Sequence, residues 1–258
     1  MTKRISRRRI LAVATLGAAS LLLAACSSSS DSASTDSAAS TDSAKVAVSL
    51  ITKDQTNPFF VAMIKGAQAK ASELGVDLTV ASGKQEGDDA SQIAAIENAI
   101  SAKQAGILIT PMSVNVNDAI KKARAAGLFV IALDTPPDPA DTVDITFATD
   151  NCEAGRLIGK WAAAKLGGQK AVIALLDIFN DRVVSVDYCR DNGFLDGMGI
   201  DVKDPKKMGD EAKTGKYSGG DYEIVGNVAT GANEAGGRTG LEQLLAKNKK
   251  INVVYTIN

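Results

Sequence analysis

The chain has 258 residues, of which 45% are hydrophobic and 4% aromatic, so it can bury one large core or two smaller ones. Its formal net charge is −1, but residues 1–25 carry five basic and no acidic side chains, which leaves 24 basic and 30 acidic residues in the remainder. A mildly acidic body argues against nucleic acid as a partner. The chain has no histidine, so it lacks the usual general base and the commonest metal ligand. We therefore expect no cofactor and no metal site.

The N-terminus has the pattern of an export signal. After the basic start, an apolar run from Ile10 to Ala25 is short for a membrane span and suits a signal-peptide core. The stretch LAAC, residues 23–26, resembles a bacterial lipobox, so we expect residues 1–25 to be a lipoprotein signal peptide and Cys26 to carry the lipid. Ordinary secretion, with Cys26 incidental, is the alternative. The stretch SRRRIL, residues 6–11, also resembles a twin-arginine signal, and the general secretory route remains open.

Residues 26–45 join this signal to the rest of the chain. After Cys26 they consist of Ser, Ala, Thr and Asp with one Lys, and they cannot bury apolar surface. We expect a flexible linker that holds a folded body off a membrane. The predicted location is outside the cytoplasm, anchored by lipid to the outer face of the cell membrane or periplasmic.

From Val46 onward, short apolar runs alternate with helical patterns. The expected strands are 46–51, 77–81, 106–110, 128–133, 145–149, 170–176, 223–229 and 251–257. The expected helices are about 58–74, 89–104, 115–126, 153–166, 183–197 and 233–247. One face of the helix at 153–166 carries Ala154, Leu157, Ile158, Trp161 and Ala162. No element is expected in the Gly/Asp/Lys-rich stretch 199–222.

Continuous apolar strands that alternate with helices predict an α/β fold with parallel sheets covered by helices on both sides. We expect two lobes, an N-terminal lobe at 46–150 and a C-terminal lobe at 151–258. The second lobe has fewer expected strands and ends on an apolar strand, so we expect it to be incomplete and the chain to be truncated.

Ligands of open parallel sheets bind outside the carboxyl ends of the strands. Phe59 and Phe60 follow the first expected strand, Asp134 follows the fourth, and Asn258 follows the last. Residues 180–182, Asn-Asp-Arg, follow the strand at 170–176. If the lobes face each other, these side chains line one cleft. Aromatic rings, carboxylate, guanidinium and carboxamide together suit a sugar, which has apolar C–H patches and hydroxyls that both donate and accept.

Each of these residues also has a purely structural interpretation. Phe59 and Phe60 could belong to the core, Asp134 could form a turn before Thr135-Pro136-Pro137, and Arg190 could be a surface ion-pair partner. Cys152 and Cys189 could form a disulfide or remain buried thiols.

The sequence resembles the ribose/galactose-type periplasmic binding proteins of bacterial ABC importers, and most closely their fructose-binding branch. The resemblance runs from Lys45 to Asn258 and includes the stretches TNPFFVAMIKGAQAKASELG, AGILITP, ARAAGLFVIALDTP, FATDNCEAGRLIG, NDRVVSVDYCRDNGF, EAGGRT and NVVYTIN. It implies two Rossmann-like lobes of the type I periplasmic binding protein class, joined at a hinge and closing on one sugar.

The resemblance also implies roles for individual residues. Asn57, Phe59 and Phe60 would hold and stack the sugar, Asp134 would accept its hydroxyls, and Asn258 would contact it from the second lobe. Arg190 matches an arginine near the sugar, although ribose binders place the contacting arginine two residues earlier, where this chain has Tyr188. Ribose binders also carry an arginine at the position of Thr135, which argues against ribose. Asp150 and Asn151 match the first hinge crossing.

The expected function is capture of a monosaccharide, fructose-like, and its delivery to the transmembrane subunits of an ABC permease, without catalysis. One alternative is a sugar sensor that docks on a membrane receptor kinase. Another is an exported sugar-active enzyme that uses Asp134 with a second carboxylate such as Asp181.

Overall fold

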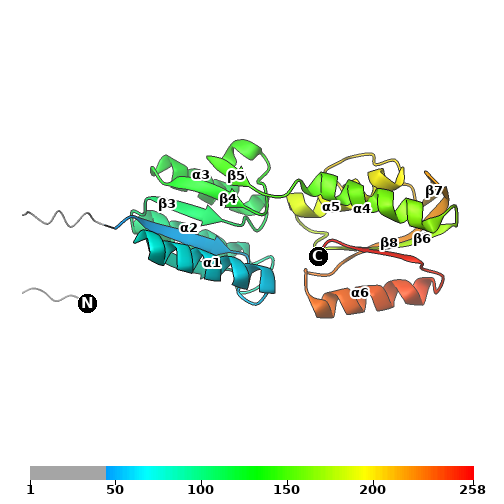
Figure 1. The fold of residues 1–258 in the computed structure, drawn as a ribbon, viewed down its shortest axis with the longest axis horizontal. Helices are drawn as coiled ribbons and strands as arrows, with labels where there is room; N and C mark the ends of the chain where they lie inside the picture. Colours follow the sequence, from blue (N-terminus) through cyan, green and yellow to red (C-terminus); the bar gives the residue numbers. More distant parts are fainter. Residues whose placement is uncertain (1–44) are drawn as a thin grey trace, which may run out of the picture. The chain divides into compact units, whose positions relative to one another are not determined.

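The structure, a computed structural model, describes residues 45–258 (Figure 1). The predicted signal peptide, Cys26 and all but the last residue of the predicted linker lie outside these residues. Two sheets follow each other along the chain, one built from residues 47–147 and one from residues 171–256. We refer to residues 45–150 as the N-terminal half and to residues 151–258 as the C-terminal half. The lobe boundary near residue 150 stays a prediction.

The N-terminal half contains a five-stranded parallel sheet in the order β2-β1-β3-β4-β5. Its strands are β1 (Ala47–Thr52), β2 (Asp77–Ser82), β3 (Gly106–Ile109), β4 (Phe129–Leu133) and β5 (Ile145–Phe147). Its helices are α1 (Pro58–Leu74), α2 (Asp89–Ser101) and α3 (Asn117–Ala125), with short 3₁₀ turns η1 (Val114–Val116) and η2 (Ala140–Thr142). The buried core lies between the sheet and α2 and α3, with Ile51, Ile96, Ile107 and Ile120 at its centre.

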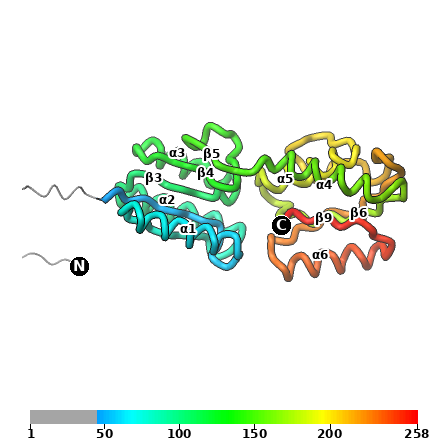
Figure 2. The backbone as a smooth tube through the Cα atoms, viewed as in Figure 1, coloured from blue at the N-terminus to red at the C-terminus, as the bar shows by residue number. Residues whose placement is uncertain are grey.

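The C-terminal half contains a four-stranded sheet in the order β7-β8-β6-β9. Its strands are β6 (Ala171–Asp177), β7 (Thr214–Tyr217), β8 (Gly220–Ala229) and β9 (Val253–Thr256), and its helices are α4 (Asn151–Leu166), α5 (Ser185–Met198) and α6 (Glu234–Lys247). The tube in Figure 2 follows this half from α4 to β9. The parallel α/β class is confirmed, but the second sheet is mixed, because β7 runs antiparallel to β8. The prediction that the stretch 199–222 forms no element is therefore wrong. A tight turn at residues 218–219 joins β7 to β8.

Helix α1 begins and ends as its sequence indicates. Asn57 caps its N-terminus, since its side chain accepts a hydrogen bond from the N–H of Phe59, and Pro58 occupies the first turn. Gly75 ends the helix with φ 67°, a left-handed conformation that glycine adopts without strain. These caps fix the point at which the chain passes from β1 into α1, and Phe59 and Phe60 lie at that point.

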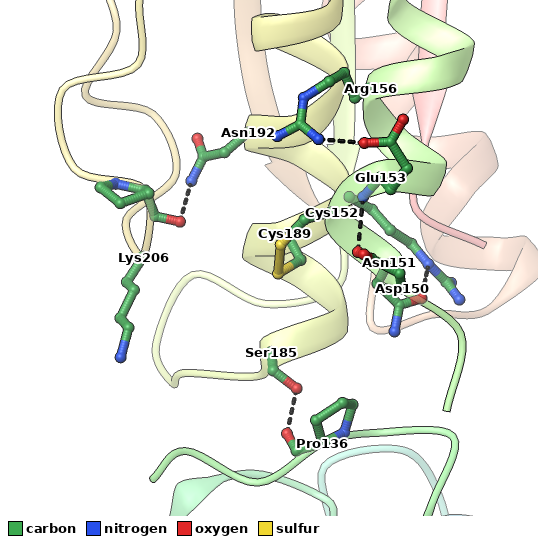
Figure 3. The surroundings of a disulfide bond; sticks show 12 residues. Pro136, Asp150, Asn151, Cys152, Glu153, Arg156, Ser185, Cys189, Asn192 and Lys206 are labelled. Atoms are coloured by element: carbon green, nitrogen blue, oxygen red, sulfur yellow. Dashed lines mark hydrogen bonds and ion pairs between the residues drawn. A yellow bond between two sulfur atoms is a disulfide. The ribbon is translucent and has the colours of Figure 1, made fainter. Parts of the chain in front are cut away.

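Helices α4 and α5 pack closely through glycines. A Cβ added to Gly155 or Gly159 of α4 would lie 2.3 or 2.1 Å from a backbone oxygen of α5, and Gly193 and Gly197 of α5 are equally close to α4. The disulfide Cys152–Cys189 joins the same two helices, which settles the pairing that the sequence left open (Figure 3).

The predicted apolar face of α4 is not the buried one. Leu157, Ile158 and Trp161 are exposed, whereas Gly155 and Gly159 are buried against α5. The two backbones can approach this closely only on the side of α4 where glycines leave no side chain between them. The larger apolar residues of α4 therefore point away from α5. Within residues 45–258, no helix is both long and apolar enough to cross a bilayer.

Candidate functional site

A cavity of about 250 Å³ lies at the carboxyl ends of the strands of both halves. We call it the cleft cavity. The N-terminal half contributes side chains that follow β1, begin α1, follow β2 or follow β4, namely Lys53, Asn57, Phe59, Phe60, Glu86 and Asp134. The C-terminal half contributes side chains that follow β6, lie on α5 or follow β9, namely Ile178, Val186, Arg190 and Asn258. Six of the seven predicted sugar-contacting residues thus line one cavity.

The two phenylalanines occupy different environments. Phe60 is 4% exposed and belongs to the core, whereas Phe59 is 53% exposed. Their rings meet edge to face, with centroids 5.3 Å apart and planes at 72°. Phe60 therefore supports Phe59, and Phe59 offers most of the accessible aromatic surface.

Asp54 shapes the loop that carries Asn57. One carboxylate oxygen of Asp54 accepts from the N–H of Thr56 at 2.6 Å, from the hydroxyl of Thr56 at 3.0 Å and from the N–H of Asn57 at 2.7 Å. The Asn57 oxygen in turn accepts from the N–H of Phe59 at 2.9 Å. Its amide NH₂ group is then the part of the side chain that can donate to a ligand.

Asp134 lies in the left-handed region of backbone space, with φ 63°. This conformation is uncommon outside glycine and often marks functional sites. The Thr135 hydroxyl donates to the Asp134 carboxylate at 2.8 Å, and Thr135 itself is buried. Thr135 therefore supports Asp134 and does not line the cavity.

Lys53 and Glu86 form an ion pair in the cavity wall that was not predicted from the sequence. Their Nζ and Oε1 atoms lie 3.1 Å apart, and their side chains are 3% and 9% exposed. Burial raises the pKa of Glu86, and the nearby Lys53 ammonium opposes the rise. The strand-end rule applied to Lys53 as well, because it directly follows β1, but Glu86 is in a loop and gave no comparable signal.

Arg190 connects several parts of the C-terminal half. Its guanidinium donates to Oδ1 of Asn151 at 2.9 Å and to the backbone oxygen of Ile257 at 2.9 Å. Neither partner is a carboxylate, so Arg190 is not the surface ion-pair partner of the structural interpretation. It holds the start of α4 and the end of β9 beside the cavity.

Tyr188 lies apart from the other predicted residues. It is nearly buried and lines a different cavity, with Asp177, Lys206 and Asn227 among its neighbours. Burial raises the pKa of its hydroxyl, and the Asp138 carboxylate adds to the rise. Asp181 likewise lines cavities other than the one that Asp134 lines, and it pairs with Arg182 at 3.0 Å. The two carboxylates of the enzyme hypothesis therefore do not share a cavity.

The predicted hinge residues lie where the chain leaves the first sheet. Asp150 caps α4 by accepting from the N–H of Glu153 at 2.9 Å, and Asn151 is buried beside the disulfide (Figure 3). Their role in closure stays a prediction. Contacts between the two halves include Arg182 to the backbone oxygen of Gly87 at 2.7 Å and Lys206 to Asp138 at 2.6 Å.

The sequence and the fold match a known family. Residues 48–258 match the periplasmic binding protein domain, and the chain belongs to that family. It is 35% identical over 137 residues to the ribose import binding protein of Haemophilus influenzae, covering 53% of this chain and 46% of that protein. It is 30% identical over 172 residues to the D-ribose/D-allose-binding protein of Pseudomonas aeruginosa, covering 64% and 51%. The chain thus spans about half the length of the curated relatives it matches.

Solved structures share the fold. A carbohydrate transporter solute binding protein from Agrobacterium radiobacter, in complex with D-arabinose, matches with a TM-score of 0.69 and 23% identity, over 83% of this chain and 67% of that one. The periplasmic component of an ABC-type sugar transport system from Hahella chejuensis matches with a TM-score of 0.68 and 26% identity, over 82% and 70%.

Proposed function

We propose that the chain captures one neutral monosaccharide in the cleft cavity, outside the cytoplasm, and delivers it to the permease of an ABC importer. The observation that carries this proposal is that side chains from separate strand ends of both halves line one small cavity. The relatives are named as sugar import or sugar-binding proteins, which supports capture without catalysis.

The side chains of the cavity suit a sugar. Phe59 offers a flat apolar face for the C–H side of a sugar ring. Asp134 and Glu86 accept hydrogen bonds from hydroxyls, and Lys53 and Arg190 donate to them. Asn57 and Asn258 add carboxamides from the two halves. A ligand held from both halves favours the closed form, because only that form makes all of the contacts.

Charge and size narrow the ligand class. The cavity is lined by two positive side chains, Lys53 and Arg190, and two negative ones, Glu86 and Asp134. A charged ligand would leave a charge uncompensated in a partly dry site, so a neutral sugar fits better than a sugar acid or phosphate. A volume of about 250 Å³ is below the roughly 300–1,000 Å³ of drug-sized pockets, which suits one ring.

Within this class we propose fructose as the ligand. The resemblance to the fructose-binding branch supports it. Thr135, where ribose binders carry an arginine, argues against ribose, since its hydroxyl bonds to Asp134 and it does not line the cavity. A thermal-shift screen of fructose, ribose, allose, galactose, xylose, inositol and glucuronate tests the class and the sugar together. We expect the largest shift with fructose and none with glucuronate. A shift with glucuronate alone would contradict the charge argument.

We also propose that Cys26 carries a lipid that holds the protein at the outer face of the membrane. This proposal rests on the sequence alone. Cys26→Ser should leave the signal peptide uncleaved or release the protein from the membrane fraction. A variant that still matures and partitions into detergent with the membrane would contradict lipidation.

A further inference from the structure

Four acidic side chains lie buried together in the C-terminal half. Asp177 ends β6, Asp187 and Asp191 are on α5, and Glu211 is in the segment before β7. None of them is more than 4% exposed. We call these four residues the acidic cluster. It lies outside the cleft cavity, although Asp177 borders the cavity that Tyr188 lines.

Two members of the acidic cluster have partners. Asp187 accepts from the backbone N–H groups of Ile178 and Phe179, both at 2.9 Å. Glu211 lies 3.3 Å from Nζ of Lys213. By contrast, both carboxyl oxygens of Asp191 and Oδ1 of Asp177 are buried without a donor among the described residues.

The other charged and titratable groups that the structure describes around the acidic cluster do not pair with Asp177 or Asp191. Lys213 also contacts Asn227 of β8, whose side chain lowers the pKa of Asp177 against the larger effect of burial. The charges of Lys53 and Glu86 in the N-terminal half act on the pKa of Asp187. Tyr255 of β9 faces the pair as well: burial raises the pKa of Tyr255 to about 12, and the charges of Asp191 and Asp177 add to the rise. Its hydroxyl donates to the backbone oxygen of Arg190. The described residues include no group of acidic, cysteine or histidine side chains arranged to hold a metal ion. Among residues 45–258, neither Asp177 nor Asp191 forms an ion pair, and the Lys213 ammonium pairs with Glu211.

A bound proton would remove one of these buried charges. Two buried carboxylates side by side would both lack donors and would repel each other, which is unfavourable away from water. A protonated carboxyl can donate to a carboxylate, so a proton held by neighbouring Asp177 and Asp191 would supply the donor that their buried oxygens lack. Burial and then the charge of Asp187 raise the pKa of Asp177 to about 7. Burial and then the charge of Asp177 raise the pKa of Asp191 well above its usual value.

We propose that Asp177 and Asp191 share a proton in the folded chain and form a pH-sensitive switch in the C-terminal half. Loss of the shared proton gives the Asp177–Asp191 pair a second negative charge, beside the Asp187 carboxylate. That carboxylate accepts the hydrogen bonds from the backbone N–H groups of Ile178 and Phe179. Ile178 lines the cleft cavity. The effect on ligand rests on the proposed function: deprotonation loosens this wall of the cavity and weakens sugar binding.

The direction of the pH effect follows from proton linkage. The folded chain holds protons that the unfolded chain releases above its ordinary carboxyl pKa of about 4. Stability is therefore highest in mild acid and falls as pH rises toward and through 7. Asp187 also titrates below this point, because burial raises its pKa to about 6. The Asp191 variant below therefore separates the shared proton from the rest of the pH dependence.

The test measures urea unfolding at pH 5 and pH 8 without sugar. Its result therefore does not depend on whether the protein binds the proposed sugar. The wild-type unfolding equilibrium constant should rise by roughly 100-fold between these pH values. Asp191→Asn, which keeps the shape and supplies a permanent donor, should reduce the rise to less than about tenfold. Glu242→Gln on the exposed face of α6 is the charge-matched control and should behave as wild type.

If the stability of Asp191→Asn depends on pH as strongly as that of the wild type, the proposal is overturned. It is also overturned if the wild type does not lose stability between pH 5 and pH 8. If Asp191→Asn does not fold, Asp177→Asn takes its place with the same expected result. If neither folds, proton release on unfolding of the wild type near pH 6 decides the matter. Release of about one proton or more per chain supports the shared proton, and no release overturns it.

Discussion

Phe59 and Phe60 are adjacent in the chain, yet only one of them is free to meet a ligand. Phe60 is part of the core of the N-terminal half, so its replacement would disturb folding as well as binding. Phe59 stays more than half exposed at the start of α1 and lines the cleft cavity. Phe59 is therefore the better residue for testing aromatic stacking.

Phe59→Ala should weaken binding of the neutral sugar by roughly 2–4 kcal/mol, because the stacking surface is lost. Stability should change little, since the side chain is exposed. Phe129→Ala is the matched control, because Phe129 is 54% exposed in the same half and does not line the cavity. Equal sugar affinities of the two variants, measured by calorimetry, would show that Phe59 is not part of the sugar site.

Tyr188 and Arg190 show why sequence alone could not place every site residue. Residues two apart on a helix point in nearly opposite directions, so only one of this pair can line a given cavity. The structure places Arg190 with Val186, four residues earlier, in the cleft cavity, and Tyr188 on another side of α5. Because α5 is buried on most sides, its sequence has no polar stripe that could have marked the cavity side.

At the scale of elements, the strands and helices were predictable because each has a clear pattern of its own. The expected helix at 58–74 is α1 as observed, and most strand ends agree within a few residues. Strand β7 was missed because it is short, contains glycine and is mostly exposed. The buried side of α4 was missed because a glycine contact leaves no hydrophobic signal, and the visible apolar residues lie opposite it.

The α4–α5 contact should not tolerate a side chain at Gly159. Gly159→Ala places a methyl group 2.1 Å from the backbone oxygen of Phe194. We expect a loss of about 1–3 kcal/mol in the free energy of unfolding, because the helices must separate. Gly237→Ala in α6 is the control, since its added Cβ meets nothing within 4 Å. Urea unfolding that shows equal stability for both variants would contradict the close packing.

The disulfide between α4 and α5 should stabilise the folded chain. Cys152 and Cys189 are 37 residues apart, and closing a loop of that length is expected to contribute roughly 3–4 kcal/mol. Reduction, or the double change to Ser, should lower the urea midpoint accordingly. Mass spectrometry of the oxidised protein checks the pairing directly. Two free thiols in protein purified from an oxidising compartment would contradict it.

For the whole molecule, the arrangement of the cleft was predictable from one rule, that ligands bind at the carboxyl ends of parallel strands. That rule brought Phe59, Asp134 and Asn258 to one place although they are distant in sequence. It also placed residues 180–182 there, and these line other cavities. It could not reveal the Lys53–Glu86 pair or the acidic cluster. Both depend on which loop or helix packs over a strand end, and that is a property of the assembled fold.

The most direct test of the account is a calorimetric titration of the wild type and of Asp134→Asn with the sugar that gives the largest thermal shift. We predict one sugar per wild-type chain, and binding weakened by roughly 2–4 kcal/mol in the variant, because the sugar hydroxyls lose a charged acceptor. Asp141→Asn, an exposed carboxylate in the same half that does not line the cavity, should bind as the wild type does. Wild-type affinity in Asp134→Asn, or no binding of any neutral monosaccharide by the wild type, would contradict the assignment of the cleft cavity.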